Sequence, residues 1–276
     1  MVFVERHGTQ SGARPKRQAA RLGEKDLELL WFLGEHRMVL SEHVAALLGV
    51  TVGTADERLR KLAEAGYVRT EDLFRKWPAM QLITRAGLNA IGSALPTPRR
   101  DVRTYEHDAG VAWLWIAARR GTFGPLTEVV GERRMRSHDR SRDPGTEPLA
   151  VKLGGVGPRG SESLHYPDLL LRTTDGRRVA LELELSSKGR RRLEGILVGY
   201  AADPRFDGVV YLVQSAALAR SVGAAARRLG ISDLVHIQRV RSTVSSPAAS
   251  AALAAQRRAP GRTAPGRTSR DAGTTR

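Results

Sequence analysis

The stretch HYPDLLLRTTDGRRVALELELSSKG, residues 165–189, decides the fold of the C-terminal half. Two apolar runs flank an Asp-Gly turn signal, which predicts a β-hairpin. Alternate residues of a strand share a face, so Glu182 and Glu184 lie on one face and the leucines between them face the core. Pro167 cannot donate to a strand ladder and suits a strand start, which leaves Asp168 free to project. We therefore expect Asp168, Glu182 and Glu184 to meet at one edge of the sheet.

Such a carboxylate cluster suggests a metal site. Acidic groups held this close repel one another, which raises a pKa unless a divalent cation holds them. Hard oxygen ligands suit Mg²⁺ or Mn²⁺, and such an ion can polarise a phosphate and activate a water. The alternative is structural, because a half-exposed strand also alternates glutamates with apolar residues. Lys188 is either a cation for this centre, if the strand continues, or a plain solvated lysine.

The segments around the hairpin predict a mixed sheet flanked by helices. The patterns indicate a helix over 105–120, a strand over 127–136, a charged, Gly-rich loop over 137–163 and the two hairpin strands. They continue with a helix over 190–202, a strand over 208–214, a helix over 217–230 and a strand over 233–240. The order is αβββαβ with an extra helix and strand. It is typical of an α/β (α+β) domain, which we place at 105–241.

Residues 24–93 show three helical segments, two strands and a further helix. Ser41 can cap the second helix and Gly49 can end it, while Thr51 can cap the third and Gly66 can close it. This order resembles a winged helix-turn-helix, a fold that places its third helix in the major groove of DNA. The residues that we expect to contact DNA on this helix and at the strand tip are Thr51, Thr54, Arg58, Lys61, Arg75 and Lys76. The alternative is a winged helix used for protein contacts or dimerisation.

The charge balance points to nucleic acid. The 276 residues hold 45 Lys and Arg against 29 Asp and Glu, a net charge of +16. Residues 1–23 and 242–276 are basic and poor in large apolar residues, so we expect both to be disordered, and 94–104 to be a linker. The absence of cysteine excludes disulfides and thiolate zinc sites. No apolar run has membrane-spanning or signal-peptide length, so we expect a cytoplasmic protein without a membrane partner.

The helix after the hairpin begins with Arg190, Arg191 and Arg192. Three positive charges at a helix N-terminus run against the helix dipole. They could instead hold a phosphodiester next to the carboxylates. The alternative is a solvated helix start.

The motifs together resemble two related groups. Pro167, Asp168, Glu182 and Glu184 are similar to the PD-(D/E)xK nuclease motif, although Glu184 stands where that superfamily usually has lysine. HDAGVAWLWIAARRG, EVVGERRMR, HYPDLLL and LELELSSKG, together with the winged helix, resemble the replication-relaxation family of actinobacterial and plasmid proteins. Its motifs also suggest Glu132 as an outer metal ligand or a surface salt bridge, and His107 and His165 as bases or ligands.

The resemblance implies a DNA-binding protein of plasmid or mobile-element replication or DNA relaxation. It would carry an Mg²⁺- or Mn²⁺-dependent nicking site, with Asp168, Glu182 and Glu184 as metal ligands and Lys188 as the catalytic cation. The alternative is a non-catalytic replication or mobilisation accessory protein, or a transcriptional regulator, with a degenerate nuclease fold. A nuclease acting on RNA would share the same site. The expected partners are DNA, replication or mobilisation proteins and a second copy bound through the winged helix.

Overall fold

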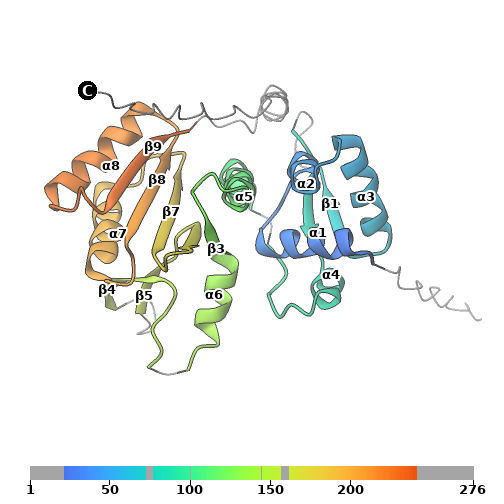
Figure 1. Ribbon diagram of the computed structural model, residues 1–276, viewed down its shortest axis with the longest axis horizontal. Coiled ribbons are helices and arrows are strands. Elements are labelled where there is room, and N and C mark those ends of the chain that lie inside the picture. Colours follow the sequence, from blue (N-terminus) through green and yellow to red (C-terminus); the bar gives the residue numbers. More distant parts are fainter. Residues whose placement is uncertain (1–21, 73–76, 100, 144, 157–161, 241–276) are drawn as a thin grey trace, which may run out of the picture. The chain divides into compact units, whose positions relative to one another are not determined.

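The computed structural model describes residues 22–72, 77–99, 101–143, 145–156 and 162–240. Its N-terminal part holds three helices, a two-stranded antiparallel ribbon and a fourth helix, in the expected order (Figure 1). These elements are α1 (Glu24–Glu35), α2 (Ser41–Leu48), α3 (Val52–Glu64), β1 (Val68–Glu71), β2 (Met80–Ile83) and α4 (Arg85–Ala90).

Most of the expected helix ends are confirmed. The Thr51 hydroxyl accepts the Thr54 N–H at 3.2 Å, and Gly49 ends α2 with φ of 69°. The expectation for Ser41 was wrong, because α2 begins at Ser41 and its cap is Leu40. The His43 ring takes the part of the N3 side chain in a capping box, since its Nδ1 accepts the N–H of the cap residue Leu40 at 2.9 Å.

The C-terminal part is built on a five-stranded mixed sheet in the order β3-β6-β7-β8-β9. Strands β3, β6 and β7 are antiparallel neighbours, whereas β7, β8 and β9 run parallel. Its elements are η1 (Val102–Thr104), α5 (Tyr105–Arg119), β3 (Leu126–Gly131), α6 (Glu132–Arg140), β4 (Val151–Val156), β5 (Glu162–His165), β6 (Leu169–Thr173), β7 (Arg178–Glu184), α7 (Arg190–Ala202), β8 (Gly208–Val213), α8 (Ala216–Arg228) and β9 (Val235–Arg239).

The hairpin of β6 and β7 forms as the sequence predicts, around Gly176 with φ of 88°. Its side chains alternate between two cores on opposite faces of the sheet. Leu181 and Leu183 pack on the α5 side, as expected of the leucines. Ala180 packs on the other side, beneath α7 and α8. Both faces of β7 are therefore covered, and the strand is not half-exposed.

Two expectations between β3 and β6 were wrong. The strand expected over 127–136 ends at Gly131, and α6 follows at once. Met135 and Asp139 are buried four residues apart, a helical spacing, and the segment has no β-branched residue to favour a strand. The loop expected over 137–163 also contains β4 and the start of β5, which pair antiparallel as a separate ribbon with Val151 opposite His165.

Helices of the two parts pack on each other, α2 against α5 and α1 against α6. The His43 ring meets Trp113 edge-on with centroids 4.6 Å apart. Arg133 on α6 donates to the carbonyl oxygens of Gly34, His36 and Pro96. These contacts fix α1 and the segment after α4 on the C-terminal part. Within the described ranges, no helix is long and apolar enough to cross a membrane.

Candidate carboxylate centre and nucleic-acid interface

Asp168 directly precedes β6 and is fixed to the neighbouring strand. Its Oδ2 accepts the Leu183 N–H of β7 at 2.7 Å. The strand register pairs Leu169 with Leu181, so Asp168 comes next to Glu182 at the end of the ladder. The sequence thus predicts correctly that Asp168 reaches the strand of the glutamates.

His107 of α5 is the basic partner of Asp168. Its Nε2 lies 3.3 Å from Asp168 Oδ2, and its Nδ1 lies 3.8 Å from Asp108. Burial alone would lower the pKa of His107, but the charges and hydrogen bonds of Asp168 and Asp108 outweigh it and raise the pKa to about 10. The imidazole is therefore positively charged at neutral pH.

Glu182 of β7 is buried, with its side chain only 3% exposed. Its Oε1 accepts hydrogen bonds from the Tyr200 hydroxyl at 2.5 Å and from His165 Nε2 at 2.6 Å. Burial would raise the pKa of Glu182, but the charge and hydrogen bond of His165, the charge of Lys188 and the Tyr200 hydrogen bond lower it. Glu182 is thus a buried, ionised carboxylate with His165 as its basic partner.

Glu184 ends β7 and forms an ion pair with Lys188. The pKa of Glu184 is raised by burial and by the negative charges of Glu182 and Asp168, while Lys188 opposes this rise. Because β7 stops at Glu184, Lys188 reaches the carboxylate from the loop before α7 and not from a continued strand. The solvated-lysine interpretation was wrong, since the Lys188 side chain is 21% exposed and paired.

The three carboxylates are close enough to affect one another, yet each has its own base. Asp168 pairs with His107, Glu182 with His165 and Glu184 with Lys188. Their oxygens suit Mg²⁺ or Mn²⁺ by chemistry. In the part of the chain that the structure describes, however, no three His, Cys, Asp or Glu side chains are grouped so that they could hold a metal ion. As placed, the residues do not form a metal site, and a shared cation stays a prediction.

Glu132 has the salt-bridge role that the sequence left open. It begins α6 and pairs with Arg37 at 2.8 Å and with Arg136 at 2.7 Å. With His107 and Asp168 it lines a cavity of about 30 Å³, which the end of α1 also borders. That volume is enough for about one water.

The arginines that start α7 differ in their surroundings. Arg190 pairs with Glu194 at 2.9 Å. Arg191 and Arg192 are exposed, and neither makes an ion pair with any residue that the structure describes. Two unneutralised charges therefore stand at the N-terminus of α7, shortly after the carboxylate strand.

The expected DNA contacts on α3 are only partly available. Thr51 and Thr54 are exposed and share a hydrogen bond of 2.9 Å. Arg58 forms an ion pair with Asp26 of α1, and Lys61 lies 3.3 Å from Glu57. Arg75 and Lys76, expected at the strand tip, lie outside the described residues.

The basic charge is unevenly distributed. Residues 24–93 hold nine Lys and Arg against ten Asp and Glu, while residues 94–240 hold 24 against 17. Apart from the two ends of the chain, the positive excess therefore belongs to the part that carries the sheet.

Tyr200 is a residue of the centre that the sequence patterns do not point to, and it also packs in the core. It is fully buried, and its hydroxyl donates to Glu182. A buried tyrosine usually has a hydrogen-bond partner, and that rule was the available signal.

No protein-family model matches the chain, and no curated protein is significantly similar to it.

Proposed function

We propose that this chain is a DNA-binding protein with an N-terminal winged helix-turn-helix and a C-terminal nuclease-like domain, of the replication-relaxation type. The element order α1-α2-α3-β1-β2-α4 supports the first part. For the second, α5, β3, β6, β7, α7 and β8 supply the αβββαβ order, with α6, β4 and β5 inserted and α8 and β9 added. The parallel pairing of β7 with β8 across α7 is the usual result of a helical crossover.

The proposal rests above all on the pair Arg191 and Arg192. They stand exposed at the positive end of a helix dipole, an unfavourable place for a cation unless an anion binds there. Arginine suits phosphate by its planar set of donors. The excess of basic residues over 94–240 favours the same polyanion.

The pairing inside the carboxylate centre favours a form of this function without cleavage. Asp168, Glu182 and Glu184 each contact a basic side chain of the same chain. A buried charge with a good partner is stable without an external ion. In this form the protein grips DNA as a replication or mobilisation accessory protein or a regulator, and the centre is a buried ionic core.

A specific observation keeps Mg²⁺- or Mn²⁺-dependent nicking as a second candidate. No hydrogen bond from the described residues reaches Asp168 Oδ1, Glu182 Oε2 or Glu184 Oε1. Each carboxylate thus keeps one oxygen for a ligand. These residues would be the metal ligands if the carboxylates moved together, and the ion would supply the charge that activates a water.

A binding measurement tests the proposed function. The double variant Arg191→Ala/Arg192→Ala is compared with Arg220→Ala/Arg227→Ala, which removes two exposed arginines of α8. We expect the first pair to weaken binding of a 20-bp duplex about tenfold and to lower the salt dependence by about two phosphate contacts. Equal losses in both double variants would contradict a role for the start of α7. Binding of an RNA duplex of the same sequence, measured in parallel, shows whether the protein prefers DNA or RNA.

A cleavage assay separates the two candidates. Purified protein is incubated with supercoiled plasmid and Mn²⁺, and open circles are scored for the wild type, Asp168→Asn and Glu182→Gln. Nicking that both substitutions abolish while duplex binding persists would establish the second candidate. Binding without nicking at any Mn²⁺ or Mg²⁺ concentration would establish the accessory role.

A further inference from the structure

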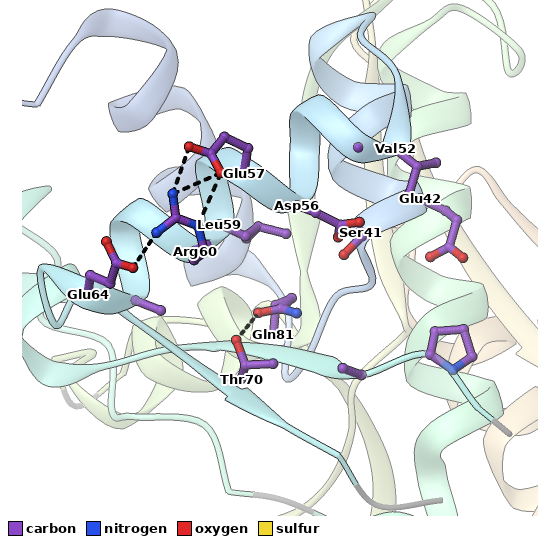
Figure 2. A pocket seen from close by; sticks show the side chains of 14 residues that line it. Ser41, Glu42, Val52, Asp56, Glu57, Leu59, Arg60, Glu64, Thr70 and Gln81 are labelled. Carbon is purple, nitrogen blue, oxygen red and sulfur yellow. Dashed lines mark hydrogen bonds and ion pairs between the residues drawn. The ribbon is translucent and has the colours of Figure 1, made fainter. Parts of the chain in front are cut away.

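A groove of about 910 Å³ lies between α3, the start of α2 and the ribbon of β1 and β2. Figure 2 shows Glu57, Arg60 and Glu64 of α3 on one side and Thr70 and Gln81 of the ribbon on the other. The two ribbon residues share a hydrogen bond of 2.7 Å, which joins the strands at this wall.

The groove is acidic. Its lining has four carboxylates and one basic group: Glu42, Asp56, Glu57, Glu64 and Arg60. Arg60 lies between Glu57 and Glu64 and pairs with both, as the dashed lines in Figure 2 mark. Glu42 and Asp56 make no ion pair within the described ranges, so their charges remain available.

Part of the groove lining is apolar. Val52 is 38% exposed at the start of α3, and Leu59, Ala63, Pro78 and Ala79 line the same hollow. An exposed valine beside apolar neighbours gains from being covered. Phosphates would meet like charges here, whereas cationic side chains with small apolar residues between them match both the acidic and the apolar residues of the lining.

We propose that this groove binds an arginine- or lysine-rich peptide segment of a partner protein. The inference does not depend on the carboxylate centre, and it leaves another flank of α3 for DNA. Asp56, Arg60 and Glu64 follow one another at intervals of four residues on the groove side. Thr54, Arg58 and Lys61 are four and then three residues apart, so they share another flank of α3, and none of them lines the groove.

The test uses fluorescence anisotropy with the full chain. The probe is a labelled peptide in which six arginines alternate with alanine and valine, and the control peptide has glutamate for arginine. Because the chain carries +16 overall and repels a cation on average, binding of the probe must come from a local acidic surface. The probe should bind and the glutamate peptide should not.

The decisive variant is Asp56→Asn/Glu64→Gln, compared with Asp233→Asn/Glu106→Gln, which removes two exposed acids outside the groove. We expect the groove variant to weaken probe binding about tenfold, about threefold for each surface charge, and the control to leave it unchanged. Val52→Ser should weaken it further. Equal effects of the two double variants would overturn the proposal. So would stronger duplex binding by the groove variant with unchanged probe binding, because the groove would then border DNA.

Discussion

The contact made by Arg133 gives the sharpest prediction about the fold. Its guanidinium lies in the first turn of α6 and donates to Gly34 O, to His36 O at 2.8 Å and to Pro96 O. Burial lowers the pKa of Arg133 to about 10, so the group still carries its charge at neutral pH. One side chain thus holds the end of α1 and the segment after α4 against the sheet-bearing part.

The hydrogen bonds that Arg133 makes determine how much stability its removal should cost. A hydrogen bond from a charged donor contributes about 1.5–3 kcal/mol, and the bond to Pro96 is exposed and adds little. We therefore expect Arg133→Ala to lower the free energy of unfolding by about 3 kcal/mol. Arg133→Lys should lower it by about half as much, because an ammonium group cannot reproduce the fork of the guanidinium.

Urea unfolding followed by tryptophan fluorescence measures this loss, since Trp113 and Trp115 lie on α5 next to the N-terminal helices. Hydrogen exchange of the α1 amides should accelerate in the same variant. Arg140→Ala, which removes an exposed arginine of the same helix, is the matched control. If Arg133→Ala and Arg140→Ala differ by less than about 0.5 kcal/mol, within the usual range of surface substitutions, the reasoning is refuted.

Three further predictions concern stability. Burial is the main cause that lowers the pKa of His36 and His43 to about 3 in the folded protein. Their contribution to the free energy of unfolding is therefore complete above about pH 6.5, the pKa of histidine in the unfolded chain, and is lost as the pH falls below that value. The buried, neutral state of each histidine should cost about 2 kcal/mol of stability at pH 5, and urea unfolding of His43→Gln should show a loss between pH 7 and 5 that is about 2 kcal/mol smaller than that of the wild type. Tyr200→Phe removes the hydroxyl donor of Glu182 and should cost about 1–2 kcal/mol by thermal melting, with Tyr67→Phe as a neutral control. Gly87→Ala should destabilise by more than about 2 kcal/mol because its Cβ would lie 2.4 Å from Tyr67 O, whereas Gly53→Ala in α3 meets nothing within 4 Å and should stabilise by about 0.5–1 kcal/mol.

Turns and helix ends depend on residues that are close together in the sequence, and these features were predicted correctly. The Asp-Gly turn predicted the hairpin, and Thr51 and Gly49 marked helix ends. The segment after Gly131 was mistaken for strand because its short run of charged residues around Met135 shows no clear period. Met135 and Asp139 are both buried, and this pattern, which favours a helix, is visible only in the tertiary structure.

The sequence indicated the acidic residues of the candidate centre, but it did not indicate which side chains pair with them. Strand alternation places Glu182 and Glu184 on one face of β7, and the hairpin brings Asp168 to the same strand, where it accepts the Leu183 N–H. Their partners come from elsewhere: His107 is 61 residues from Asp168, and Tyr200 is 18 residues from Glu182. No periodicity relates such distant residues. Lys188 was near in sequence, but its contact depends on the path of a loop after the strand has ended.

The three acid–base pairs have a consequence for how the protein assembles. A cluster of acids that depends on an ion cannot fold until the ion arrives, and chelators then unfold it. Here His107, His165 and Lys188 of the same chain already contact the carboxylates. Newly synthesised chains should therefore reach the native state in EDTA as readily as in Mg²⁺, with the same melting temperature after refolding.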